Sequence, residues 1–179
     1  MQEEPIHSYT VFQDLRQIAS GNADAALQAA HRAMERGEPK VLIFNDQTGE
    51  TVEAALLLAP GAAQRGPGRP KLGVVAREVT LLPRHWEWLN AQPGGASVAL
   101  RKLVEDARKV NAEKDRARLA REAAYRFLNS IAANLSGYEE ALRALFAGNQ
   151  EAFELKTAKW PKNLRAYALK LSADGWSKG

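Results

Sequence analysis

Residues 66–109 read GPGRPKLGVVAREVTLLPRHWEWLNAQPGGASVALRKLVEDARK, and this stretch carries the strongest pattern in the chain. A basic, glycine-rich approach leads into a short apolar strand, which we expect over residues 77–82. Pro83 suits the first turn of a helix, where a missing amide hydrogen costs nothing. The breaker PGG at residues 93–95 ends that helix, and Ser97 can cap a second, amphipathic one. The expected order is therefore strand, helix, turn and helix.

This order resembles the ribbon-helix-helix DNA-binding module, over residues 77–109. The resemblance implies a homodimer, because a strand and two helices cannot bury their apolar faces alone. It also implies that backbone amides at residues 95–97 bind a DNA phosphate at the start of the second helix. On the strand, Arg77, Val79 and Leu81 take the positions that face the bases, and only Arg77 can hydrogen-bond to base edges. Two alternatives to base contacts by this strand remain. The strand forms a dimer interface that does not contact DNA, or it packs against the N-terminal part of the chain.

The charge distribution also favours a polyanionic partner. The net charge is +4, but residues 65–126 hold 14 lysines and arginines against 7 acidic residues. A regional excess of this kind favours nucleic-acid binding. The alternative for residues 109–122 is a solvated helix face, because that segment mixes both signs. The candidate DNA-binding residues are Arg65, Arg69, Lys71, Arg77, Arg84, Gly95, Ser97, Arg101 and Lys102.

Composition and spacing predict an α+β fold in four parts. Residues 1–60 form a small α/β domain, and residues 61–73 form a glycine- and proline-rich basic linker. Residues 74–111 form the ribbon-helix-helix-like segment, and residues 112–179 form a helical bundle. The linker contains GRPK at residues 68–71, which resembles the core of an AT-hook that lies in the minor groove. A proline-stiffened, solvated linker is the alternative.

The N-terminal part is expected to contain a hairpin and a helix. A β-rich run begins at Tyr9, and a helix is expected from about Ala23 to Arg36 with a narrow stripe of alanines. The strand at residues 40–45 is followed by the turn DQTG, where Gly49 supplies a positive φ, and by a second strand through residues 51–58.

The C-terminal part is expected to be helical throughout. The helix after Ser97 is followed by a separate one with an apolar stripe from Ala120 to Leu135. Shorter helices follow at residues 138–146 and 150–159, and Trp160-Pro161 starts the last one.

Motifs for catalysis are weak, and we expect no enzyme and no cofactor. The three histidines lack metal-ligand spacing, and there is no glycine-rich phosphate loop. The turn DQTG at residues 46–49 is similar to the aspartyl-phosphate motif of phosphotransferases, but a linker follows where that fold needs further strands. Cysteine is absent, and the N-terminal MQEEPIHSY does not resemble a secretory signal. We expect a cytoplasmic protein without a membrane span, and a small-molecule ligand stays an open question.

Residues 68–109, 41–49 (VLIFNDQTG) and 158–171 (AKWPKNLRAYALKL) together resemble a bacterial family that is defined only as a domain of unknown function. That resemblance implies no activity. Two hypotheses therefore follow from the residues. The first is a homodimeric nucleic-acid-binding protein that binds double-stranded DNA and regulates transcription. The alternative is a protein–protein adaptor, in which the segment at residues 74–111 is only a dimer interface.

Overall fold

The computed structural model describes residues 8–37, 40–58, 75 and 77–176, and it confirms the α+β class. The chain divides into two compact units. Unit 1 contains residues 1–60 and 114–179, and unit 2 contains residues 61–113. Residues 1–60 and 114–179 thus fall in one unit, although residues 61–113 separate them in the sequence.

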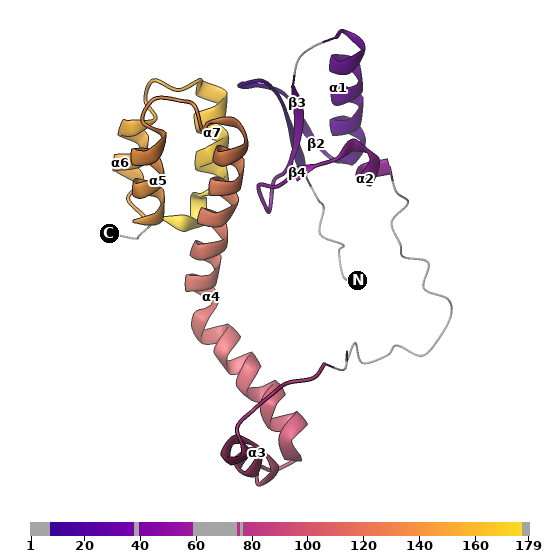
Figure 1. The fold of residues 1–179 in the computed structure, drawn as a ribbon, viewed down its shortest axis with the longest axis vertical. Helices are drawn as coiled ribbons and strands as arrows, with labels where there is room; N and C mark the ends of the chain where they lie inside the picture. Colours follow the sequence, from indigo (N-terminus) through magenta and orange to yellow (C-terminus); the bar gives the residue numbers. More distant parts are fainter. Residues whose placement is uncertain (1–7, 38–39, 59–74, 76, 177–179) are drawn as a thin grey trace. The chain divides into compact units, whose positions relative to one another are not determined.

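Unit 1 contains a four-stranded antiparallel sheet (Figure 1). Its strands are β1 (Tyr9–Gln13), β2 (Arg16–Gly21), β3 (Val41–Asn45) and β4 (Thr51–Val52), in the order β2-β1-β3-β4. Strand β2 is not expected from the sequence, because Ile18 is its only residue of the β-branched and aromatic kinds typical of strands. Its backbone pairs with β1 after a tight turn, with Gln13 opposite Arg16.

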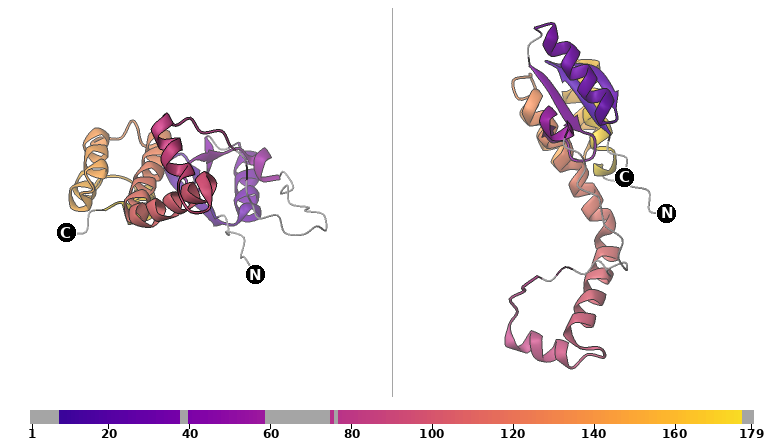
Figure 2. Two further views of the ribbon diagram at one scale, coloured as in Figure 1. Left: turned by 90° about the horizontal axis from the view of Figure 1, so that it is seen from below. Right: turned by 90° about the vertical axis from the view of Figure 1, so that its right-hand side faces the viewer.

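Helix α1 (Ala23–Glu35) covers one face of this sheet, as the two views of Figure 2 show. The side chain of Asn22 caps its first turn by accepting a hydrogen bond from the Ala25 amide at 3.0 Å. The alanine stripe lets the helix approach the sheet closely, so that Ala26 and Ala30 pack with Val11 and Ile43.

The other face of the sheet packs against helices from the C-terminal part of unit 1. Phe12 and Phe44 project from β1 and β3 and meet Phe127 of α4 (Gly95–Ile131) and Tyr167 of α7 (Lys162–Leu171). Ring centroids of Phe44 and Phe127 lie 4.9 Å apart, and those of Phe127 and Tyr167 lie 4.7 Å apart, both edge to face. One aromatic core thus joins the N-terminal strands to the C-terminal helices.

Three shorter helices complete unit 1: α5 (Tyr138–Phe146), α6 (Gln150–Lys156) and the 3-10 helix η1 (Ala173–Gly175). Helix α6 ends three residues before the expected boundary. Trp160 is buried between α6 and α7, and its indole N–H donates to the Ser136 carbonyl at 2.8 Å.

Two expected boundaries differ from the structure. The expected second strand ends at Val52, and α2 (Ala54–Leu58) replaces its continuation, since alanine and leucine favour helix. The two expected helices between residues 97 and 135 are one helix, α4, which ends at Ile131. Neither glycine nor proline occurs between residues 96 and 131, so nothing in the sequence interrupts it.

Unit 2 contains α3 (Pro83–Asn90) and the first part of α4. Pro83 occupies the first turn of α3, as expected, and Leu82 before it is extended. The expected strand is wrong: residues 77–82, all of them described, form no strand. An extended segment without a paired neighbour makes none of the ladder hydrogen bonds that define a strand. The ribbon-helix-helix resemblance is therefore not supported at its strand.

Candidate functional site

The structure places four of the expected DNA-binding cations on the surface of unit 2. Arg77 precedes α3, Arg84 lies in its first turn, and Arg101 and Lys102 lie on α4. All four side chains are exposed. Three further expected residues, Arg65, Arg69 and Lys71, lie outside the described residues.

Several arginines of α4 pair with carboxylates, in contrast to these four cations. Arg108 pairs with Glu105 at 3.2 Å, and Arg118 pairs with Asp115 and Glu122. Arg101 donates only to the Ser97 carbonyl, at 3.1 Å. Within the described ranges, neither Arg101 nor any of the other three forms an ion pair, so their charge is not offset by a neighbouring carboxylate.

Of the amides expected to bind phosphate, the one at Gly95 is already used. It donates to the Gln92 carbonyl at 2.9 Å and closes the turn between α3 and α4. Gly94 and Gly95 both adopt positive φ, 84° and 75°, which this turn requires. Ser97 is exposed in the first turn of α4, where helical amides lack intrahelical partners. Of the amides at residues 95–97 that are expected to bind phosphate, the one at Gly95 is therefore not available.

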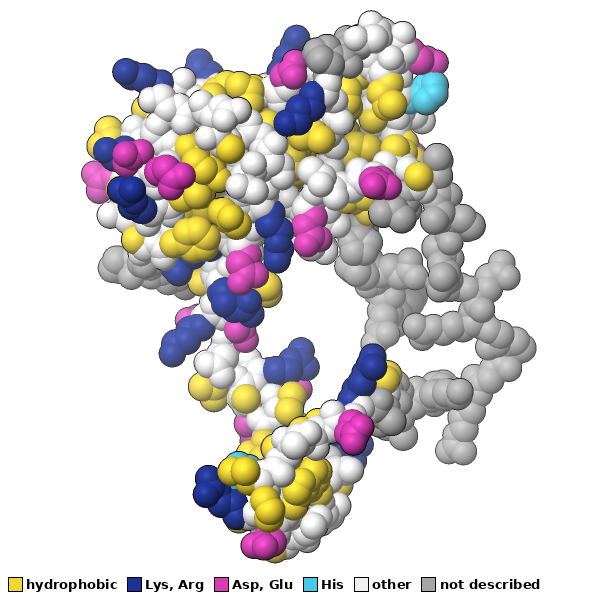
Figure 3. Space-filling view, in the orientation of Figure 1, with side chains coloured by type: hydrophobic (Ala, Val, Ile, Leu, Met, Phe, Trp, Pro, Cys, Tyr) yellow, Lys and Arg dark blue, Asp and Glu magenta, His cyan; other side chains and the backbone are white. Residues whose placement is uncertain are grey.

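Apolar side chains form a second feature of unit 2. Figure 3 shows hydrophobic side chains gathered over α3, with lysines and arginines beside them. A groove of about 260 Å³ lies between α3 and α4 and is lined by Leu81, His85, Trp88, Leu89, Leu100 and Leu103. Trp88 is 53% exposed and Val104 is 57% exposed. The described part of unit 2 therefore exposes apolar side chains in and near this groove.

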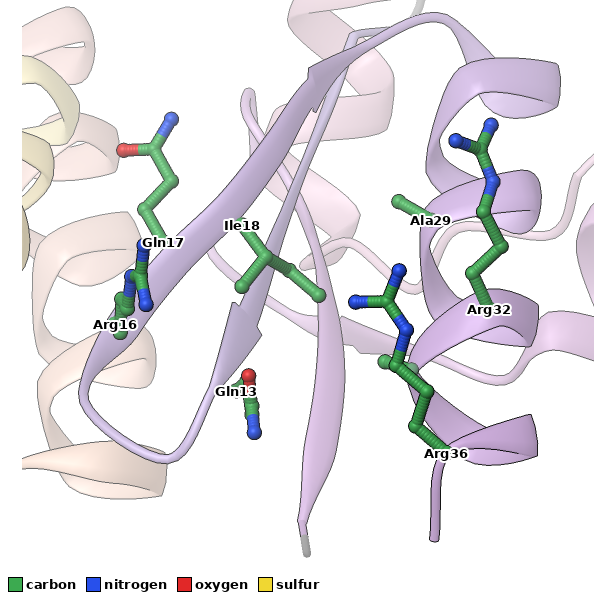
Figure 4. Close-up of a pocket in the computed structure, with 8 residues that line it drawn as sticks. Gln13, Arg16, Gln17, Ile18, Ala29, Arg32 and Arg36 are labelled. Atoms are coloured by element: carbon green, nitrogen blue, oxygen red, sulfur yellow. The ribbon is translucent and has the colours of Figure 1, made fainter. Parts of the chain in front are cut away.

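Unit 1 contains an arginine-lined groove that the sequence analysis missed. It lies between α1 and the β1–β2 hairpin and has a volume of about 340 Å³ (Figure 4). Arg32 lies in the last turn of α1, Arg36 is the residue that ends this helix, and Arg16 comes from β2. The spacing of Arg32 and Arg36 places them on one side of a helix, but β2 was not expected, so Arg16 could not be placed beside them.

Asp46 forms the most elaborate polar cluster of unit 1. Its carboxylate accepts hydrogen bonds from Thr10 Oγ1 at 2.7 Å, Tyr167 OH at 2.8 Å, Ser8 Oγ at 2.9 Å and Lys170 Nζ at 2.7 Å. The Asp46 side chain is 6% exposed. Burial acts to raise the pKa of Asp46, but the four hydrogen bonds outweigh it and hold that pKa below its ordinary value of 3.8.

This cluster ties the DQTG turn to α7. Each carboxylate oxygen of Asp46 accepts two hydrogen bonds, which accounts for its lone pairs. Burial and the Asp46 charge raise the pKa of Tyr167, so that its hydroxyl stays protonated and donates. The arrangement supports the interpretation of residues 46–49 as a structural turn, and the sequence analysis did not foresee the four partners.

The turn also packs closely on α4. Gly49 adopts a φ of +67°, as expected, and a Cβ at this position would collide with the carbonyl of Ala123. Arg126 donates to the Thr48 carbonyl at 3.2 Å. The turn therefore contacts both α4 and α7.

Two negative observations concern the described part of the chain. No group of three or more histidine, aspartate or glutamate side chains lies close enough there to hold a metal ion. None of the helices in those residues is both long and apolar enough to cross a bilayer.

Comparison with known proteins gives one match. Searches of curated proteins and of solved structures found no similar protein. A family model described as "Uncharacterized protein conserved in bacteria (DUF2239)" matches residues 8–172, which include both units. This chain therefore belongs to the DUF2239 family of bacterial proteins.

Proposed function

We propose that this protein binds nucleic acid through the exposed cations of unit 2 and acts as a homodimer. The observation that carries the proposal is a set of exposed cations that have no acidic partner among the described residues: Arg77, Arg84, Arg101 and Lys102. Cations of this kind release counterions from a phosphate backbone, which supplies most of the affinity for DNA of any sequence. Arg65, Arg69 and Lys71 add positive charge to the same stretch of sequence.

The contacts in this proposal are mainly to phosphates. No side chain in residues 77–82 is held in a strand, so base readout through Val79 or Leu81 has no support. The amide of Ser97 and the start of α4 add a favourable site for one phosphate. Regulation of transcription would follow only if a preferred DNA sequence exists.

The homodimer is proposed because unit 2 buries little of its own apolar surface. Among its described residues, the buried hydrophobic side chains are Leu89 and Ala99. Two helices with so small a core need a partner to cover their apolar faces. A second copy presents the same faces, so that a twofold interface matches them to one another.

The second candidate function is a protein–protein adaptor. The observation that favours it is the exposure of Trp88 and Val104 beside the apolar groove. Aromatic and aliphatic side chains of this kind form the centre of protein interfaces. In that case the exposed cations of unit 2 contribute to solubility and do not bind a ligand.

Binding of random-sequence duplex DNA, measured by fluorescence anisotropy at about 50 and 200 mM salt, tests the first function. We expect affinity to fall steeply with salt. The triple variant Arg77→Gln/Arg101→Gln/Lys102→Gln should reduce the slope of log K against log salt by about 0.9 for each phosphate contact removed.

The matched control removes three exposed cations from unit 1, as Arg143→Gln/Lys159→Gln/Lys162→Gln. It should leave DNA affinity close to that of the native chain. An equal loss in both triple variants would mean that only net charge matters, and no binding at the low salt would sink the nucleic-acid proposal and favour the adaptor.

A further inference from the structure

The arginine-lined groove of unit 1 joins side chains from two separate parts of the sequence. Figure 4 shows Arg36 extending from the end of α1 toward Ile18 on β2, while Gln13 and Arg16 lie across from it on the β1–β2 hairpin. Ile18 and Ala29 supply apolar surface between them. The volume of about 340 Å³ lies within the range of sites for small ligands.

The chemistry of the lining is cationic. Three arginines and Gln13 line the groove with polar side chains, and no aspartate or glutamate lines it among the described residues. The acid nearest in sequence on α1, Glu35, pairs with His31 at 3.3 Å. Asp14, in the hairpin turn, lines a different hollow with Leu15 and Pro161.

Stabilisation of the end of α1 does not account for all three arginines of the groove. Cations in the last turn of a helix offset its partial negative charge, which explains Arg32 and part of the role of Arg36. Arg16 lies on the opposite side of the groove, in β2, where no helix end requires a cation. Arg32 is held by a hydrogen bond to Gln28 Oε1 at 3.1 Å, which orients its guanidinium.

We propose that this groove binds a small ligand that carries phosphate groups. Guanidinium groups bind phosphate oxygens in pairs, and several arginines around one space match a ligand with more than one negative charge. Gln13 can donate to a remaining oxygen, and Ile18 can contact the organic part. A concave site of this size fits a small molecule better than a nucleic-acid backbone. The proposal is independent of DNA binding by unit 2.

Inorganic pyrophosphate is the probe, and its binding to the full chain is measured by isothermal titration calorimetry. We expect saturable binding at constant ionic strength. The variant Arg16→Gln/Arg32→Gln should weaken it by about tenfold or more, because two charge-assisted hydrogen-bonding groups are lost. Both side chains are exposed, so that the variant is expected to fold, and circular dichroism and the unfolding midpoint check this.

The matched control, Arg143→Gln/Lys159→Gln, removes the same charge from exposed positions outside the groove and should bind pyrophosphate as the native chain does. Arg32→Lys should give an intermediate affinity, since it keeps the charge but loses the paired donors. Absence of saturable binding by the native chain, or an equal loss in the control, would overturn the proposal. DNA affinity measured on Arg16→Gln/Arg32→Gln should be unchanged, and a loss there would assign the groove to nucleic acid instead.

Discussion

The two halves of helix α4 share one continuous backbone but have opposite surroundings. Residues 101–116 are exposed on every side, whereas Ala123, Ala124, Phe127 and Leu128 are buried in the aromatic core of unit 1. The exposed half is stabilised locally, by the ion pair of Arg108 with Glu105 at 3.2 Å and by the absence of helix breakers. Helix formation and tertiary burial are therefore separate properties of this sequence.

Units 1 and 2 also differ in how far their side chains are buried, and this difference separates effects on stability from effects on binding. Unit 1 buries its large side chains and ties its turn and helices with buried polar groups, whereas unit 2 exposes both its apolar and its cationic side chains. Changes in unit 1 should mainly alter the free energy of unfolding. Changes in unit 2 should mainly alter association with a partner.

The largest effect is expected for Phe127→Ala, which removes a buried ring from the centre of the aromatic core. Loss of its contacts with Phe12, Phe44 and Tyr167 should lower the free energy of unfolding by about 3–5 kcal/mol. Urea denaturation followed by circular dichroism measures it. Phe146→Ala is the control, because that ring is half exposed, and it should cost less than half as much. Equal losses would contradict the proposed centre of the core.

The next effect is expected for Gly49→Ala in the turn that packs on α4. The new Cβ would meet the Ala123 carbonyl in a backbone conformation that alanine disfavours, so the loss should be about 3 kcal/mol. Gly37→Ala is matched in φ at +67°, but among the described residues no heavy atom lies within 4 Å of its Cβ. It should cost only about 1 kcal/mol. The same denaturation experiment separates strain from collision.

Asp46→Asn should lower the free energy of unfolding by about 2 kcal/mol at neutral pH, because it weakens the hydrogen bonds to Lys170 and Tyr167. The pKa of Asp46 is lower in the folded chain than its ordinary value of 3.8. Its contribution is therefore present above about pH 3.8 and is lost as the pH falls through the folded pKa.

Unfolding midpoints measured from pH 7 to pH 2 check this prediction. The difference between the native chain and Asp46→Asn should shrink toward the acid end. The control is Asp14→Asn, at an exposed position whose φ of 46° asparagine tolerates, and it should track the native chain. A difference that stays constant with pH would mean that the Asp46 charge is not the cause.

The smallest effect on unfolding is expected for Trp88→Ala in unit 2, at less than about 1 kcal/mol for the monomer, because half of the ring is exposed. Self-association should respond much more strongly. Sedimentation velocity over a range of concentrations should show the native chain as a dimer and the variant shifted toward monomer. A native chain that stays monomeric would leave the apolar groove to a different partner and argue against the homodimer.

Much of the local structure could be predicted from residue patterns. Asn22 marks the start of α1, Pro83 marks the start of α3, and Gly49 marks the turn after β3. These signals succeed because capping, proline geometry and positive φ depend on neighbouring residues alone. Strand β2 could not be predicted, because most of its residues are polar or small. The position of Arg16 in the arginine-lined groove could therefore not be predicted either.

The sequence by itself determined the α+β class, the positions of most helices, the turn at Gly49 and the concentration of positive charge in residues 65–126. Only the tertiary structure decided that Phe12 and Phe44 share a core with Phe127 and Tyr167, and that Asp46 gathers four partners. The physical reason is that propensity and charge act over a few residues, whereas these contacts join positions more than 30 residues apart. Such contacts form through burial of apolar surface, which depends on the whole fold.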